Sequence, residues 1–183
     1  MAFCSVHADE EVGGMQLPFA VTACLQSTFT AANCGTCAYP FLTIAAGNML
    51  NSVGTPAQIE RYLLPMLEGK VFGTMNLSET QAGSSLGDIT TKAVRRDDGT
   101  YSISGQKMWI SGGDHDLSDN IFHMVLAKVR SDGGSGDTEA GVKGISLFIV
   151  PKYRMAHQHR AGERNGVALA GLNHKMGTSW CIL

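Results

Sequence analysis

Two short segments carry residue types suited to binding an anionic ligand with a flat ring. The first, Met75 to Ser84, leaves a predicted strand for a loop of small and hydroxyl-bearing residues, where backbone amides can approach an anion closely. The second ends a predicted strand with Trp109 and Ser111, two positions apart and therefore on one face. An indole beside a hydroxyl suits a flat heterocycle. Either segment alone is more simply explained as a polar turn or a core tryptophan, because isolated short motifs are weak signals.

A serine-hydrolase pattern overlaps the first segment. Residues 83–87 match Gly-x-Ser-x-Gly with Ser85 as the nucleophile, and Asp116 and His174 follow in the order of that class. The motif has to lead from a strand into a helix. Residues 88–94 are alternating and β-branched instead, which predicts a strand. The hydrolase is therefore the weaker alternative, and labelling of Ser85 by a fluorophosphonate would revive it.

Two cysteines, Cys34 and Cys37, have the spacing of a redox or zinc motif. A zinc site needs two further ligands, and only the distant Cys4 and His7 offer themselves. We therefore predict plain thiols in a loop that enters a helix, and no metal site. The 5 cysteines are scattered and odd in number, unlike a secreted disulfide framework, which favours a reducing compartment.

The elements that must position these segments begin with helices. Apolar residues recur every three or four positions over residues 17–28, 42–53 and 59–67, which predicts three helices. Pro18 suits the first turn of the first helix. Gly54 is expected to end the second helix in the left-handed conformation.

The third predicted helix has the clearest boundary signals. Thr55 is the expected N-cap, with Pro56 at the first helical position and Gln58 completing a capping box. Pro65 cannot donate the usual backbone hydrogen bond, which predicts a kink or an early end there. Gly69 is expected to close the helix.

The first part of the chain is almost free of charge. No residue from Val12 to Ile59 is charged, and the first Lys or Arg is Arg61. Helices with no charged face need other helices around them, so we expect residues 1–70 to belong to a larger bundle completed by further chain or by another subunit. Polar residues interrupt every apolar run before ~18 residues, so no membrane span is predicted. Neither a secretory signal nor an Arg-rich transit peptide is expected.

Short strands are predicted after residue 70, where the apolar period changes to two. Asp97 to Gly99 is a hairpin-turn signal, and residues 131–141 are expected to form a surface loop. Helices followed by strands predict segregated α+β layers and argue against a parallel sheet built from βαβ units. The candidate strands are 71–77, 89–95, 100–104, 106–111, 121–130, 143–150 and 166–172.

The composition bounds the class of protein. The 183 residues suffice for one to two domains. Apolar residues make up 44% of the chain, which excludes disorder over its whole length. The net charge of −2, from 14 basic and 16 acidic residues, gives no reason to expect nucleic-acid binding.

Taken together and in this order, the two segments resemble the signatures of the flavin-dependent acyl-CoA dehydrogenases. Similar motifs occur at residues 143–151 and 174–177, so the resemblance runs from about Glu11 to Gly177. Ser85 stands where the family usually has Asp. The matching residues are Met75, Leu77, Ser78, Glu79, Ala82, Gly83 and Ser84 in the first signature and Gly105, Lys107, Trp109, Ile110 and Ser111 in the second.

This resemblance implies a fold and a cofactor. Residues 1–70 would be the end of an N-terminal helical domain and residues 71–183 a middle antiparallel β-barrel, with the family's C-terminal helical domain absent. FAD would lie between barrel and helices, and Ser84 would also contact the CoA substrate. The residues implied to contact FAD are Met75, Leu77, Ser78, Gly83, Ser84, Trp109, Ile110 and Ser111.

The resemblance also implies a reaction. The family removes an α-proton from an acyl-CoA while a hydride passes from the β-carbon to the flavin, giving a trans-2-enoyl-CoA. Its base belongs to the C-terminal domain, so no carboxylate here inherits that role, Glu79 included, and the chain alone should not turn over.

The implied partners are acyl-CoA, electron-transfer flavoprotein and further copies in a dimer or tetramer. The implied compartment is the bacterial cytoplasm or the mitochondrial matrix. An oxidase or a non-catalytic binding member of the same superfamily is the alternative.

Overall fold

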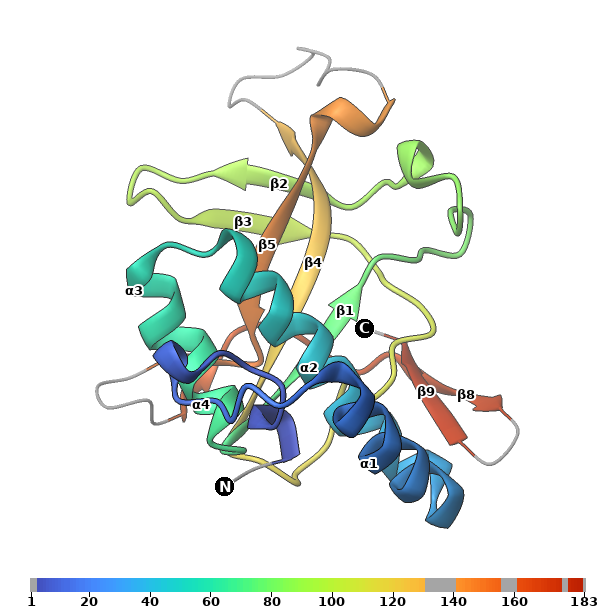
Figure 1. The fold of residues 1–183 in the computed structure, drawn as a ribbon. Coiled ribbons are helices and arrows are strands. Elements are labelled where there is room, and N and C mark those ends of the chain that lie inside the picture. Colours follow the sequence, from blue (N-terminus) through green and yellow to red (C-terminus); the bar gives the residue numbers. More distant parts are fainter. Residues whose placement is uncertain (1–2, 131–140, 156–160, 176–177, 183) are drawn as a thin grey trace.

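The computed structural model describes residues 3–130, 141–155, 161–175 and 178–182. Helices form one layer, which lies over one face of a β-sheet (Figure 1). This arrangement confirms the predicted α+β class. No helix in the described part of the chain is both long enough and apolar enough to cross a membrane.

Two helices form the first hairpin of the chain, after the short 3-10 turns η1 (Phe3–Ser5) and η2 (Glu10–Val12). Helix α1 (Phe19–Ala32) starts directly after Pro18, which is its N-cap. Helix α2 (Cys34–Val53) starts well before the predicted position, because the Asn33 side chain accepts a hydrogen bond from the Thr36 amide and caps it. The predicted left-handed end at Gly54 is wrong, since Gly54 is extended, with φ −72° and ψ 147°.

The third helical segment confirms the capping box. The Thr55 amide donates to Gln58 Oε1 at 2.9 Å, and the Gln58 amide donates to Thr55 Oγ1 at 3.3 Å. The segment runs through α3 (Pro56–Gln58), a π-helical turn η3 (Ile59–Leu63) and α4 (Leu64–Leu67). It thus continues past Pro65, and the irregularity takes the form of the π-helical turn ahead of the proline. Gly69, with φ +74°, follows in the left-handed conformation.

The main sheet is built around one long strand, β4 (Asn120–Arg130). One edge of β4 pairs in parallel with β1 (Val71–Asn76) and, further along, with β2 (Lys92–Arg95). Its other edge pairs antiparallel with β5 (Ile145–Pro151). Strand β3 (Tyr101–Ser104) forms an antiparallel hairpin with β2.

The expected antiparallel barrel is therefore corrected to a mixed sheet, which is not closed within the described residues. The reason lies in the connection between β1 and β2, residues 77–91. It carries the chain away from the sheet and returns it to the same edge of β4 in the same direction. No hairpin therefore leads from β1 directly into a neighbouring strand of the sheet, and without one neither pairing with β4 has to be antiparallel.

Several strand boundaries also differ from the prediction. The predicted strand at residues 106–111 is wrong, because this segment is irregular, and most of residues 166–172 precede strand β8. The hairpin turn before Thr100 is confirmed, with Gly99 at φ +80°. Nearly all of the predicted loop 131–141 lies outside the described residues. The remaining strands are β6 (Tyr153–Met155), β7 (Ala161–Arg164), β8 (Gly171–Lys175) and β9 (Thr178–Ile182).

The hydrophobic core lies between this sheet and the helices. Gly73 of β1 lets the sheet approach α2 closely, because a Cβ atom there would lie 2.7 Å from the Cβ of Ala46. The ring of Tyr62 packs edge-on against Phe122 of β4. The buried members of the core cluster are Ala46, Leu50, Leu63, Met66, Leu67, Val71, Phe122 and Met124.

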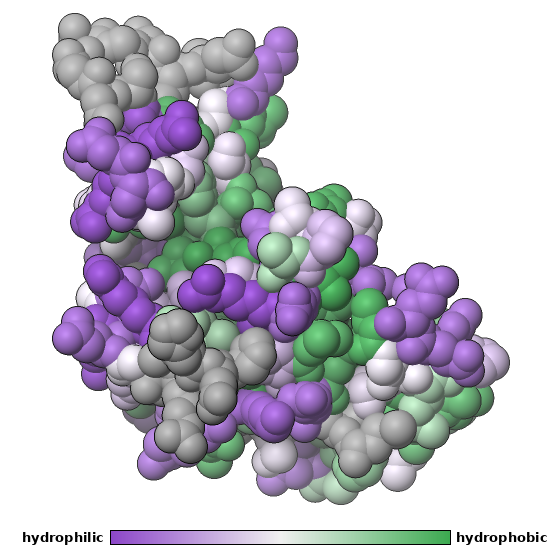
Figure 2. Space-filling view, turned by 90° about the vertical axis from the view of Figure 1, so that its left-hand side faces the viewer, coloured by the Kyte–Doolittle hydropathy of each residue, from purple (hydrophilic) through white to green (hydrophobic). Residues whose placement is uncertain are grey.

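Two surfaces of the described part of the chain carry apolar side chains that no other element covers. Helix α1 buries only Thr22, and Phe19 is 82% exposed at its start. On another side an open groove of about 900 Å³ is lined by residues of β3 and β5, among them Tyr101, Ile103 and Phe148. A hollow with a hydrophobic floor is visible on the face drawn in Figure 2. The exposed face of α1 agrees with the expectation that the helices of residues 1–70 need further cover.

Candidate functional site

The first signature segment folds into a tight turn after β1. The Glu79 amide donates to the Ala82 carbonyl at 2.9 Å, and the Ala82 amide donates back to the Glu79 carbonyl at 3.2 Å. Both residues are buried, whereas the following Gly83 and Ser84 are exposed. The turn therefore anchors the segment at one end and presents its glycine and serine at the other.

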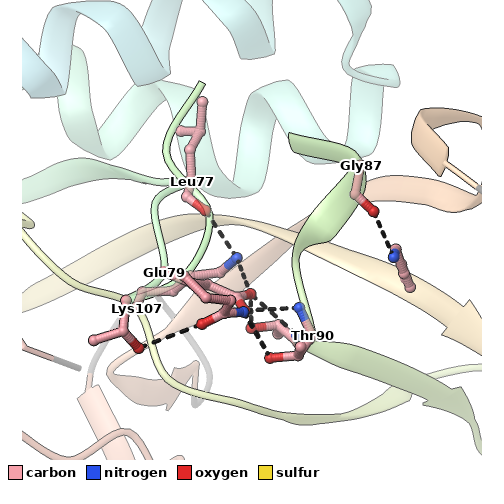
Figure 3. Close-up of polar contacts among 9 residues, drawn as sticks. Leu77, Glu79, Gly87, Thr90 and Lys107 are labelled. Carbon is pink, nitrogen blue, oxygen red and sulfur yellow. Dashed lines mark hydrogen bonds and ion pairs between the residues drawn. The ribbon is translucent and has the colours of Figure 1, made fainter. Parts of the chain in front are cut away.

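The carboxylate of Glu79 is the centre of the polar contacts in this region (Figure 3). Oε1 accepts hydrogen bonds from the Thr91 amide, the Thr91 hydroxyl and Lys107 Nζ, at 3.0, 2.6 and 2.9 Å. Oε2 accepts from the Thr90 amide, the Thr90 hydroxyl and Gln81 Nε2, each at 2.7 Å. The carboxylate thus fixes the tight turn, the chain leading into β2, and the second signature segment to one another.

Electrostatics keep this carboxylate ionised. Burial would raise the pKa of Glu79, but the hydrogen bonds from Thr91, from Thr90 and from Lys107 outweigh burial and hold the pKa well below its usual value. Burial lowers the pKa of the Lys107 ammonium, and the neighbouring Glu79 opposes that change. A strongly stabilised carboxylate is a poor proton acceptor, so Glu79 is unsuited to act as a general base.

Two further hydrogen bonds join the signature segments directly. Lys107 Nζ donates to the Leu77 carbonyl at 3.0 Å, and the Met108 amide donates to the Ser78 carbonyl at 3.0 Å. The backbone of the second segment is thereby drawn onto the first. Leu77 and Ser78 thus lie beside the residues that immediately precede Trp109.

Trp109 has an unusual backbone conformation. Its φ is +59°, a left-handed value that bulky residues rarely adopt and that often marks functional sites. The residue is 40% exposed, while the next residue, Ile110, is only 2% exposed. Ile110 therefore anchors the turn and Trp109 presents its indole at the surface. The expectation that Trp109 and Ser111 share a strand face is wrong, because the segment is not a strand; Ser111 lies half-buried in the turn.

Two glycines of the signatures differ in their surroundings. A Cβ atom on Gly105 would lie 2.3 Å from Thr91 Oγ1 and 2.8 Å from Thr91 Cα, so the fold itself requires this glycine. A Cβ atom on Gly83 would meet nothing within 4 Å. Packing within the chain therefore does not explain Gly83, whereas close approach of a ligand to the backbone would.

The remaining predicted contact residue, Met75, lies at the edge of this region. It is half-buried on β1 and packs against the hydrophobic core cluster. Of the predicted set, Leu77, Ser78, Gly83 and Ser84 belong to the anchored first segment, and Trp109, Ile110 and Ser111 to the second. The structure thus joins the two groups through Glu79 and Lys107.

The structure gives no support to the serine-hydrolase pattern or to a metal site at the two cysteines. The Ser85 hydroxyl donates to Asp88 Oδ2 at 2.6 Å within a 3-10 turn (Leu86–Asp88), and no α-helix follows as a hydrolase motif requires. Cys34 and Cys37 lie in the first turn of α2 rather than in a loop ahead of it. No cluster able to hold a metal ion occurs among the residues that the structure describes.

Sequence reasoning missed the organising role of Glu79, Thr90 and Thr91. The signals were a single carboxylate in a loop of small residues, two adjacent threonines after it, and a lone lysine in an otherwise uncharged segment. Neither spacing nor periodicity could bring these groups together, because they meet only through tertiary structure.

Comparison with known proteins gives the family. The family model of the acyl-CoA dehydrogenase N-terminal domain matches residues 1–70, and that of the middle domain matches residues 74–181. The chain therefore belongs to the acyl-CoA dehydrogenase family.

Individual relatives support the same family assignment. The 3-methylmercaptopropionyl-CoA dehydrogenase of Ruegeria pomeroyi is 41% identical over 177 residues, which cover 97% of this chain and 29% of that protein. The broad-specificity linear acyl-CoA dehydrogenase FadE5 of Mycobacterium tuberculosis is 38% identical over 179 residues, or 94% of this chain and 27% of that one. A Bacillus anthracis acyl-CoA dehydrogenase solved in complex with FAD has the same fold, with a TM-score of 0.73 and 23% identity over 98% of this chain and 27% of its own. The chain thus spans less than a third of each of these proteins.

Proposed function

We propose that this chain supplies one wall of the FAD site of an acyl-CoA dehydrogenase. The observation that carries the proposal is the link between the two signature segments. Lys107 joins Glu79 and the Leu77 carbonyl, and so holds the exposed Trp109 indole next to the anchored loop. Groups fixed in this way need no reorganisation when a ligand binds.

The residues present fit FAD. Open space at Gly83 and the exposed Ser84 suit a pyrophosphate or the CoA moiety of the substrate, because backbone amides and hydroxyls bind anions well. The Trp109 indole suits the flat flavin ring, and the Ser111 hydroxyl is a donor for its polar edge. Ile110 and Met75, which pack inward, contribute by positioning the backbone. The proposed FAD contacts are therefore Met75, Leu77, Ser78, Gly83, Ser84, Trp109, Ile110 and Ser111. Ser84 is also the proposed substrate contact.

The proposed reaction is oxidation of an acyl-CoA to a trans-2-enoyl-CoA. When bound, FAD supplies the acceptor for the hydride that leaves the β-carbon. The α-proton needs a separate base, and Glu79 is unsuited to that role because six hydrogen bonds stabilise its ionised form. In this proposal the base lies in a C-terminal helical domain outside this chain, so residues 1–183 alone do not turn over.

The uncovered surfaces support a larger assembly. Under this proposal residues 1–70 and 71–183 are parts of two domains, and the bare face of α1 and the open groove are covered in the whole protein by further domains or subunits. The whole protein would be a dimer or tetramer that passes electrons to an electron-transfer flavoprotein, in the bacterial cytoplasm or the mitochondrial matrix.

The test uses full-length protein containing this chain and loaded with FAD. Anaerobic mixing with a saturated acyl-CoA should bleach the flavin absorbance and yield the enoyl-CoA. An oxidase member would be bleached in the same way without oxygen, but in air its colour would return and hydrogen peroxide would be released at the rate of turnover. Flavin that no acyl-CoA reduces would contradict the proposed activity and favour the non-catalytic alternative.

A further inference from the structure

Three aromatic rings meet where helix α2, strand β1 and the loop after Ser111 come together. The Tyr39 ring centroid of α2 lies 6.0 Å from that of Phe72 on β1 and 5.1 Å from that of His115 in the loop. Phe72 and His115 lie 5.2 Å apart. The interplanar angles of 61°, 80° and 83° are those of edge-to-face contacts, which aromatic pairs prefer. The three rings therefore hold three separate segments together.

Tyr39 also lies directly against the turn that carries the indole and the hydroxyl. A Cβ atom on Gly112 would lie 2.9 Å from Tyr39 Cδ1 and 3.3 Å from its Cε1. Gly112 has φ +62° and immediately follows Ser111. The glycine thus allows the tyrosine ring to pack on the backbone one residue from Ser111.

The loop that carries His115 is fixed on its far side as well. Lys152 Nζ donates to the His115 carbonyl at 2.9 Å and pairs with Asp114 at 2.5 Å. The Leu117 amide donates to His115 Nδ1 at 3.2 Å. These contacts hold His115 in place, so its ring gives the Tyr39 ring a fixed packing partner.

We infer that Tyr39 is a positioning residue for the turn from Trp109 to Ser111. Lys107 fixes the start of this turn through Glu79, and Tyr39 fixes its end through Gly112 and His115. The helical part of the chain thereby sets where the indole and the hydroxyl stand. The inference rests on the proposed function only for the ligand that the turn contacts, which is FAD in that proposal. The positioning of the turn by Tyr39 is a property of this chain alone.

The test follows Trp109 fluorescence in the 183-residue chain with Trp180→Phe, which leaves Trp109 as the single tryptophan. Tyr39→Leu removes the ring and should shift the Trp109 emission to the red and raise its quenching by acrylamide about twofold. Tyr39→Phe keeps the ring and should behave like the parent. Should Tyr39→Leu fail to fold, Tyr39→Met, which also lacks the ring but keeps a longer apolar side chain, should produce the same change.

Tyr62→Leu is the matched control, because Tyr62 also packs edge-on against a sheet residue, Phe122, at 5.2 Å, but it does so at the hydrophobic core cluster between the helices and the sheet. It should lower thermal stability and leave Trp109 emission and quenching unchanged. The inference is overturned if a folded Tyr39→Leu keeps the parent's Trp109 signals, or if Tyr62→Leu changes them as much. Because no flavin is present, this result is independent of the FAD proposal, which fails separately if acyl-CoA does not reduce the flavin of the full-length protein.

Discussion

Lys107 Nζ lies 2.9 Å from Glu79 Oε1, and the two side chains are only 4% and 2% exposed. This buried ion pair joins the two signature segments of the chain. Removing one partner of such a pair leaves the other charge buried without compensation. The pair is therefore the point at which the site is most sensitive to substitution.

Lys107→Met should lower the free energy of unfolding by about 3 kcal/mol or more, because it leaves the Glu79 carboxylate buried without its cation. Urea titration followed by circular dichroism measures the change. Lys70→Met is the control: Lys70 pairs with Glu68 at 2.7 Å, but both side chains are more than half exposed, at 62% and 55%. It should cost about 0.5 kcal/mol or less. Equal effects of the two variants would contradict the role given to the buried pair.

Acid should destabilise the protein through a buried histidine. The Thr74 hydroxyl donates to Asn76 Oδ1 and so accepts from His123 Nδ1, 2.7 Å away. Burial lowers the pKa of His123 from 6.5 to about 4. Between these two pKa values the unfolded chain binds a proton at His123 that the folded chain does not bind. The free energy of unfolding is therefore unaffected by this group above pH 6.5, and it decreases as the pH falls from 6.5 towards 4.

The full loss from this histidine is roughly 3 kcal/mol. Burial also lowers the pKa of His115, which adds to the loss in the same direction. Urea titrations at a series of pH values should show a flatter dependence for His123→Gln than for the parent. A variant with the parent's full acid dependence would show that His123 is not the group responsible.

The two signature glycines should respond differently to alanine. Gly105→Ala collides with the Thr91 backbone and should destabilise the chain by about 1–3 kcal/mol, as overpacking does. Gly83→Ala meets open space within the chain and should leave the melting temperature unchanged. In the full-length protein Gly83→Ala should instead weaken FAD binding, measured by flavin release on dilution. Equal FAD affinity of that variant and the parent would argue against ligand approach at Gly83.

The order of helices and strands, the capping box at Thr55 and the α+β class could be predicted, because caps, turns and periodicity are local properties. Parallel pairing of β1 with β4 could not, since it depends on where the excursion of residues 77–91 returns. The strand predicted at residues 106–111 fails for a related reason: Lys107 and Met108 bond to the first segment instead of to a neighbouring strand. The structure brings the two signature segments together through Lys107 and Met108, while the strand geometry assumed for Trp109 and Ser111 was wrong.

The 183-residue chain should hold FAD only weakly, because it offers one wall of the proposed site and leaves the groove and α1 uncovered. Protein purified in the presence of FAD should be nearly colourless after gel filtration. A yellow protein with one FAD per chain after that step would contradict the proposal that other domains complete the site.

The most direct test of the proposed flavin wall is stopped-flow reduction of full-length Ser111→Ala by a saturated acyl-CoA without oxygen. A donor at the edge of the flavin stabilises the negative charge that develops there. The substitution should therefore slow flavin reduction about tenfold or more, or ~1.4 kcal/mol in the barrier, while Ser111→Thr keeps the hydroxyl and most of the rate. Ser104→Ala, at an exposed position at the end of β3, should have no effect. A reduction rate and flavin potential unchanged in Ser111→Ala would contradict the placement of this turn against the flavin.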